Sequence, residues 1–159
     1  MLQLTVIIPI RAFFTSFERS FALNINLKEI STEALAYLGD CVIELKVREM
    51  LVESGISGSG NLNKASLNYV KASSQAQAMR RLIPLLSEEE TAVFKRGRNM
   101  SGGNVPKSAT MSEYRAATGM EVLFGYLHIK GDRSRIDFLF SVAYSEAEKS
   151  NDKDNNNNI

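Results

Sequence analysis

Apolar side chains recur at helical spacing along most of the chain beyond residue 30, most clearly in the segment 32–54. Two apolar stripes run along this segment: Leu35, Leu38, Val42, Leu45 and Val52 form the first, and Ala36, Ile43, Val47 and Met50 form the second. A helix that is apolar on two sides is expected at the centre of a core. Asp40 falls inside the second stripe, where a carboxylate is costly unless something positive, such as a metal ion, meets it. Its neighbour Cys41 points away from it and is expected in the core.

Capping signals predict two further helices. Ser87 with Glu90, and Thr110 with Glu113, have the three-residue spacing of a capping box, in which each side chain bonds the other residue's backbone N–H. The first box predicts a helix that ends near 96–97. The second predicts a helix that runs to residue 130 and is closed by Gly131.

The remaining helices are placed by turn and cap residues. A glycine-rich turn spans 55–60, after which Asn61 or Asn63 is expected to cap one helix that continues to about Ile83. Asp132 is expected to cap a last helix, whose apolar stripe is Ile136, Leu139, Phe140, Ala143 and Ala147. No convincing alternation of apolar and polar residues occurs after the first ten residues. The sequence therefore predicts an all-α domain.

Composition limits the class of protein without choosing its function. The 159 residues are enough for one domain with a substantial core, and the apolar fraction of 44% is ordinary for a globular protein. The net charge of +1 argues neither for nor against nucleic acid. The single cysteine excludes an internal disulfide and a thiolate metal cluster, and it fits a reducing compartment.

We expect three parts along the chain: an N-terminal extension of unknown role (1–26), a helical domain (27–149) and a disordered, Asn-rich tail (150–159). The apolar run at the start is too short to span a bilayer and lacks the basic start of a secretory signal. An extra strand or helix, or an over-long start, explains it better than targeting. No membrane partner is expected.

A second carboxylate lies in the predicted helix 111–130. Glu121 belongs to a stripe of small and polar side chains at helical spacing, which leaves room beside it for an ion, water or another backbone: Tyr114, Thr118, Glu121, Gly125 and His128. Asp40 and Glu121 are far apart in the sequence, so only the fold could bring them together. Paired carboxylates suit a hard cation such as magnesium. The alternative is that each acid pairs with a core arginine or caps a neighbouring element.

Positive charge gathers around the end of the predicted helix 88–97, at Lys95, Arg96 and Arg98, with Asn99 next and Lys107 beyond a glycine-containing loop. Such a cluster beside a loop is typical of phosphate binding. Lys64 and Lys71, two turns apart, could extend it. The alternative is that the cluster only complements the helix dipole.

Other catalytic arrangements find no support in the sequence. The single histidine, His128, lies about 10 Å along the helix from Glu121, which favours a structural or surface role. There is no glycine-rich phosphate loop, serine–histidine–acid set or zinc-ligand spacing.

Several segments together resemble one family. Leu38-Gly39-Asp40 followed by Glu44 resembles the signature helix of ribonuclease III catalytic domains, and 118–127 resembles the second acidic helix of that fold. Four linking segments resemble the Mini-III branch in particular: Asn63-Lys64, Val70-Lys71-Ala72-Ser73-Ser74-Gln75-Ala76, Lys95-Arg96-Gly97-Arg98-Asn99 and Pro106-Lys107. The resemblance covers roughly 29–149, and in this branch the ribonuclease III domain stands without an appended double-stranded-RNA-binding domain.

The resemblance implies a cytoplasmic, magnesium-dependent endoribonuclease that cuts double-stranded RNA and leaves 5′-phosphate and 3′-hydroxyl ends. The implied substrate is the precursor of large-subunit (23S) ribosomal RNA. The implied partner is a second copy of the chain, in an all-helical homodimer. Ribosomal proteins are further candidate partners, and whether one presents the RNA is a question that the sequence does not answer. Asp40 and Glu121 become metal ligands and catalytic residues. The implied RNA contacts are Lys95, Arg96, Arg98, Asn99 and Lys107, with Lys64 and Lys71 as weaker candidates.

Three positions depart from the wider family. Ala36 and Thr118 stand where full-length ribonuclease III enzymes have further acids, a loss that the Mini-III branch shares and that puts a full two-metal site in doubt. Asn63 stands where the branch usually has histidine.

The rival function is a scaffold that binds structured RNA without cutting it, and a third possibility is a helical dimerisation domain without an RNA partner. Retention of both Asp40 and Glu121 favours the enzyme.

Overall fold

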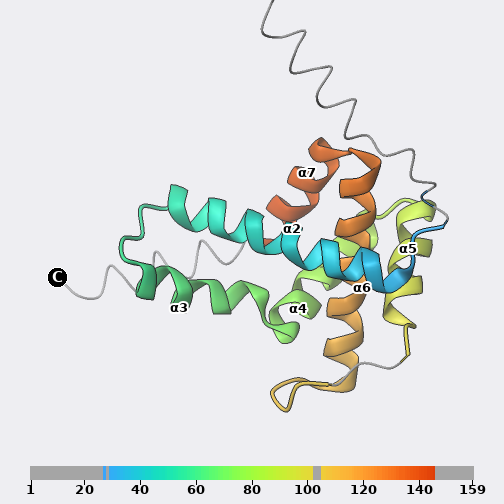
Figure 1. The fold of residues 1–159 in the computed structure, drawn as a ribbon, viewed down its shortest axis with the longest axis horizontal. Coiled ribbons are helices and arrows are strands. Elements are labelled where there is room, and N and C mark those ends of the chain that lie inside the picture. Colours follow the sequence, from blue (N-terminus) through green and yellow to red (C-terminus); the bar gives the residue numbers. More distant parts are fainter. Residues whose placement is uncertain (1–26, 28, 102–104, 146–159) are drawn as a thin grey trace, which may run out of the picture. The chain divides into compact units, whose positions relative to one another are not determined.

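The computed structural model describes residues 27, 29–101 and 105–145, and every helix described lies in the second of two compact units, Ser31–Ile159. That unit is all-helical, with no strand among the described residues, which confirms the predicted fold class. Figure 1 shows the elements in order: α2 (Thr32–Glu53), α3 (Ser59–Val70), α4 (Ala72–Leu82), the 3₁₀ turn η1 (Ile83–Leu85), α5 (Glu88–Arg98), α6 (Met111–Lys130) and α7 (Arg133–Tyr144).

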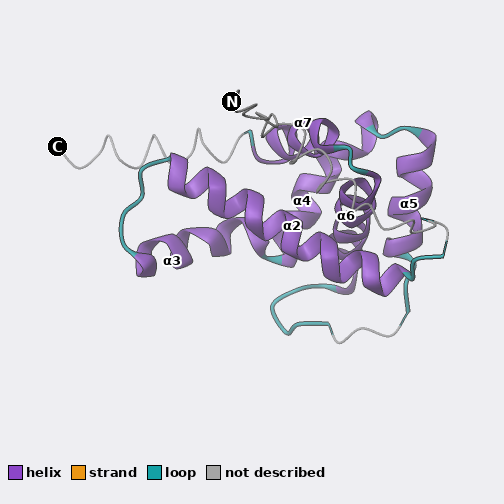
Figure 2. Cartoon of the chain, turned by 45° about the horizontal axis from the view of Figure 1, so that its top comes forward, coloured by secondary structure: helices purple, strands orange, loops and turns teal. Residues whose placement is uncertain are grey.

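The most enclosed helix is α6, around which α2, α4, α5 and α7 pack (Figures 1 and 2). Between Ala117 and Leu127 every residue is buried except Glu121, so α6 is apolar nearly all round, as a central helix is expected to be. Its one half-exposed position in that run carries a carboxylate.

The expectation that the segment 32–54 is buried on two sides is only half right. Leu35, Ile43 and Val47 are fully buried, whereas Leu45 is 57% and Val52 is 65% exposed. Helix α2 packs most extensively against α6 and also contacts α3, and these neighbours leave the side chains of Leu45 and Val52 largely exposed. Asp40 and Cys41 both lie at the surface, so the prediction that Cys41 belongs to the core is wrong.

The caps predicted for α5, α6 and α7 are confirmed. Both capping boxes are complete, with reciprocal bonds between Ser87 and Glu90 and between Thr110 and Glu113. Gly131 ends α6 in the left-handed conformation at φ 78°, where a residue without Cβ fits at little cost. The carboxylate of Asp132 accepts a hydrogen bond from the backbone N–H of Arg135 at the start of α7.

The single helix expected from Asn61 or Asn63 to Ile83 is wrong. It is two helices, interrupted at Lys71, whose ψ of 145° is extended, and the N-cap of the first is Gly58. The break has a packing cause. Helix α3 lies along α2, whereas α4 turns away to pack on α6 and α7 (Figure 2).

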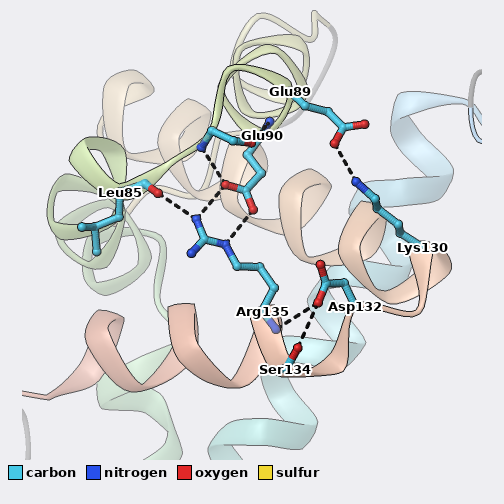
Figure 3. A network of polar contacts seen from close by, with 8 residues as sticks. Leu85, Glu89, Glu90, Lys130, Asp132, Ser134 and Arg135 are labelled. Atoms are coloured by element: carbon cyan, nitrogen blue, oxygen red, sulfur yellow. Dashed lines mark hydrogen bonds and ion pairs between the residues drawn. The ribbon is translucent and has the colours of Figure 1, made fainter.

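A network of ion pairs fastens α5 to α6 and α7 (Figure 3). Arg135 bonds the buried carboxylate of Glu90 at 2.8 Å and the carbonyl of Leu85 at 2.7 Å. Lys130 bonds Glu89 at 2.6 Å. These contacts hold the start of α5, so they also fix the direction in which its basic C-terminal turn projects.

Several predictions concern residues that the structure does not describe. These are the N-terminal extension (1–26), the C-terminal limit of the domain at residue 149, Ala147 and the Asn-rich tail (150–159). Among the described helices, none is long and apolar enough to cross a membrane.

Candidate active site

Two glycines let α2 and α6 cross in backbone contact. A methyl group at Gly39 would overlap the carbonyl of Glu121 and come within 2.8 Å of the Gly125 nitrogen. A methyl at Gly125 would overlap the carbonyl of Leu35. Only residues without Cβ permit so close an approach. The crossing therefore brings the backbone beside Asp40 against the backbone of Glu121, and one of the two predicted acids lies on each helix.

The two carboxylates are electrostatically coupled. Burial raises the pKa of Glu121 to about 7, and the negative charge of Asp40 adds to the rise. Burial also raises the pKa of Asp40, with a further contribution from Glu44. Neither acid forms an ion pair or hydrogen bond with a described side chain, so neither is paired with an arginine in the part of the chain that the structure describes. Two nearby acids with raised pKa values favour the binding of a cation.

The donor set fits a hard cation held by few protein ligands. Two carboxylates supply the oxygen atoms that magnesium prefers, and magnesium commonly keeps several waters. Within the described residues no third acid, histidine or cysteine completes a three-ligand cluster. Glu44 is drawn instead to Arg48, 3.1 Å away and one turn further along α2. Ala36 and Thr118, where the wider family has acids, add no charge.

A second glycine contact brings the basic end of α5 against α6. A methyl at Gly97 would come within 2.7 Å of the Val122 side chain, and one at Gly119 within 2.6 Å of the Phe94 ring. The last turn of α5 thus packs on the stretch of α6 that contains Glu121. This contact was not predicted from the sequence, although a glycine such as Gly119 inside an apolar helix indicates close packing.

The cations predicted to hold RNA are all exposed. Lys95, Arg96 and Arg98 form the last turn of α5, and Asn99 is its C-cap. The Arg98 guanidinium lies 6.0 Å from the centre of the Phe94 ring and 3.4 Å from the side-chain oxygen of Asn99. None of the three cations has a carboxylate partner among the described residues. Their charge complements the helix dipole and remains available to an anion.

The weaker candidates are spread over other elements. Lys64 lies on α3, Lys71 in the extended link before α4, and Lys107 in the loop that precedes α6, and each is exposed without a described ion-pair partner. His128 is exposed on α6, in keeping with the expected surface role.

Comparison with known proteins agrees with this arrangement. The ribonuclease III domain model matches residues 33–132. A Mini-ribonuclease 3 of Symbiobacterium thermophilum is 44% identical over 109 residues, covering 69% of this chain and 84% of that protein. A Mini-ribonuclease 3 of Enterococcus faecalis is 35% identical over 128 residues, covering 79% and 97%.

A solved structure shows the same fold. The crystal structure of a Fusobacterium nucleatum protein matches with a TM-score of 0.70 at 27% identity, covering 77% of this chain and 98% of that one. Both the domain and the relatives agree with the resemblance drawn from the sequence. The chain belongs to the ribonuclease III family and, within it, to the Mini-ribonuclease 3 proteins, and it is therefore an endoribonuclease.

Proposed function

We propose that this endoribonuclease is a cytoplasmic enzyme that hydrolyses double-stranded RNA with magnesium and trims the precursor of 23S ribosomal RNA. The observation that carries the proposal is the meeting of Asp40 and Glu121 at the α2–α6 crossing without a cationic partner among the described residues. Unpaired acids whose pKa values are raised are typical of functional sites, and a purely structural acid would be expected to have a partner.

In this proposal the carboxylates of Asp40 and Glu121 hold the ion. Bound magnesium supplies activation of water and stabilisation of the charge that develops on the phosphate. The close crossing of α2 and α6 keeps the two carboxylates in fixed relation. The half-buried position of Glu121 reduces screening by solvent, which strengthens its interaction with a cation.

The basic surface positions the RNA strand. Lys95, Arg96, Arg98, Asn99 and Lys107 contact backbone phosphates, with Lys64 and Lys71 as further contacts. The wide, shallow minor groove of A-form RNA favours recognition of shape and 2′-hydroxyl groups, so strict sequence specificity is not expected. Ribosomal proteins that present the precursor are the further partners of this proposal.

The proposed enzyme is a homodimer joined through the uncovered side of α2. Tyr37, Leu45 and Val52 are 80%, 57% and 65% exposed on this helix. Large apolar side chains repeated along one face favour burial against a partner. The family resemblance implies a homodimer, so the proposed partner is a second copy of the chain. Leu45→Glu is expected to give a monomer in analytical ultracentrifugation, and an unchanged mass for this variant would contradict the interface.

The test is cleavage of an end-labelled RNA duplex by the wild type and by Asp40→Asn, each with magnesium and with chelator. The substitution removes a charge at nearly constant shape. The wild type is expected to cut only with metal, and the variant to bind without cutting. If the wild type binds duplex but never cuts with any divalent metal tried, the scaffold function replaces the nuclease.

A further inference from the structure

A groove with a volume of about 580 Å³ lies between α2 and α7. Within the described residues these two helices do not pack closely against each other. An ion pair spans the gap instead, since the ammonium of Lys46 on α2 lies 2.8 Å from the carboxylate of Asp137 on α7. The volume falls in the range of clefts that bind ligands. The groove is therefore large enough to receive side chains from another molecule.

The apolar part of the lining is held in place. It consists of Met50, Phe140, Val142 and Tyr144. The rings of Phe140 and Tyr144 pack on each other with their centres 4.9 Å apart. The Tyr144 hydroxyl donates a hydrogen bond to the backbone carbonyl of Tyr69, which fixes the direction of its ring. An occupant thus meets an apolar surface that is already formed.

The charged part of the lining is acidic. Glu49, Glu53 and Asp137 supply three carboxylates against the one ammonium of Lys46, which leaves an excess of two negative charges. Lys46 bonds Glu49 at 2.9 Å and Asp137 at 2.8 Å. Hydrogen bonds to Asp137 and Glu49 raise the pKa of Lys46. An aliphatic ammonium therefore already fits between two of the carboxylates, and Glu53, which has no described ion-pair partner, remains available to a second cation.

The groove lies away from the acid pair of the candidate active site. Glu49 follows Asp40 by nine residues, and at about 100° per residue the two side chains point to opposite sides of α2. The negative charge of the groove also repels phosphate. An RNA strand bound at Asp40 and Glu121 is therefore not the molecule that the groove suits.

A basic segment of a protein complements both parts of the lining. The aliphatic stem of arginine or lysine packs on apolar surface while its charged end reaches a carboxylate. The hydroxyls of Ser141 and Ser145 donate to carbonyls within α7, at 2.8 Å and 3.3 Å, and their oxygens can still accept a bond from a backbone N–H. A simple amine would leave most of the apolar lining uncovered.

We infer that the groove between α2 and α7 docks a segment of a partner protein in which arginine or lysine alternates with apolar residues. Its cations pair with Glu53, Glu49 and Asp137, and its apolar side chains cover Met50 and Phe140. The inference goes beyond the proposed function, because this contact needs neither RNA nor metal. The domain could then bind RNA and the partner protein at the same time on different sides of α2.

The experiment titrates the full chain with a short, capped peptide of alternating arginine and leucine and follows the backbone amides by NMR. The amide signals of Met50, Ser141 and Val142 are expected to shift, and the affinity is expected to fall as salt is added. The control peptide carries citrulline, which is neutral and has nearly the shape of arginine. It is expected to bind roughly tenfold more weakly.

Two variants test the groove itself. Glu53→Gln is expected to weaken the arginine peptide roughly twofold to fivefold with an unchanged melting temperature, because the side chain is exposed. Glu33→Gln is the matched control, since Glu33 is an exposed acid in the first turn of the same helix and outside the groove. Ser141→Trp fills the groove without changing its charge and is expected to abolish binding.

Other occupants are separate outcomes of the same titration. Competition with duplex RNA uses the Asp40→Asn chain as the parent, so that the RNA stays intact. Displacement of the arginine peptide by an equal concentration of duplex RNA, of spermidine or of a peptide of residues 146–159 would overturn the inference. Equal binding of the arginine and citrulline peptides, or an equal loss in Glu33→Gln, would also overturn it. Each of these results leaves the proposed function standing, because no cleavage of RNA enters the measurement.

Discussion

Two glutamates in this domain are both shielded from solvent, and their surroundings shift their pKa values in opposite directions. Glu90, at the start of α5, is 6% exposed and is bonded by Arg135, which holds the pKa of that carboxyl below its usual range. Glu121, in the middle of α6, is half-buried near Asp40 without a described cation, and burial raises its pKa to about 7. The residue type is the same in both places, but only Glu90 has a positive partner within the described part of the chain.

The comparison separates a carboxylate that is expected to stabilise the fold, Glu90, from one that is expected to destabilise it, Glu121. Glu90 and Arg135 fasten α5 to α7, and the pair gives the buried carboxylate of Glu90 a positive partner. Glu121 and Asp40 repel one another across a crossing that is made close by glycine. A cation bound by Asp40 and Glu121 would offset their negative charge, as Arg135 offsets that of Glu90.

Breaking the satisfied pair is expected to have the largest effect. Arg135→Met leaves Glu90 as a shielded, unpaired charge and is expected to lower the free energy of unfolding by about 3 kcal/mol at pH 7. The pKa of Glu90 is depressed, so its contribution is present above the ordinary value of 4.5 and is lost as the pH falls through the lower value in the folded protein. Denaturation at pH 7 and below pH 4 measures this. Lys130→Met, at an exposed pair, is the control and should change little.

Opening the glycine crossing is expected to cost slightly less stability. Gly39→Ala forces α2 away from the Glu121 carbonyl, with an expected loss of about 2–3 kcal/mol in chemical denaturation. Gly60→Ala is the matched control, because Gly60 lies on α3 with no atom close to an added methyl, and it should be neutral or slightly stabilising. Equal stability of the two variants would contradict the close crossing.

Neutralising the unpaired acid is expected to stabilise the metal-free protein. Because the pKa of Glu121 is raised when folded, the folded chain binds more protons than the unfolded one between pH 4.5 and about 7, and stability falls as the pH rises through that window. Glu121→Gln removes this cost and should add about 2 kcal/mol at pH 8 in chelator. Near pH 4 the wild type and the variant should be equal. A loss of stability at pH 8 would contradict an unpaired acid.

Removing one charge from the α5 end is expected to have the smallest effect. Arg96→Gln, in the Asp40→Asn parent, should reduce the salt slope of RNA binding by about one and leave the melting temperature unchanged, because Arg96 is exposed without a described ion-pair partner. An unchanged slope would remove Arg96 from the RNA surface.

Local sequence signals predicted most of the helix ends, but they did not predict which helices pack against each other. Capping boxes and Gly131 act within four residues, so the limits of α5 and α6 were readable. The break at Lys71 was not, because it depends on α3 and α4 having different packing partners. The exposed side of α2 was missed for a similar reason: apolar periodicity favours a buried face without saying which other elements cover it.

The sequence supplied candidate residues for the site but not their geometry. The spacing along α6 singled out Glu121 as an acid with room beside it, and the pairing with Asp40 came from the family resemblance. The pattern placed Asp40 within an apolar stripe, whereas the structure leaves Asp40 exposed although Ala36, Ile43 and Val47 of that stripe are buried. The mutual fit of Gly39 and Gly125, which sets the crossing, depends on two segments far apart in sequence.

The most direct test is a carbon-13 NMR titration of the Glu121 carboxyl group in the wild type, first with chelator and then with magnesium. Without metal, the carboxyl is expected to titrate near pH 7, and Asp40→Asn should lower that midpoint by removing the neighbouring charge. With magnesium, the midpoint should fall further, because the ion competes with the proton. A midpoint near the ordinary value of 4.5 in all three samples (wild type with chelator, Asp40→Asn, and wild type with magnesium) would contradict an electrostatically coupled acid pair that binds a cation.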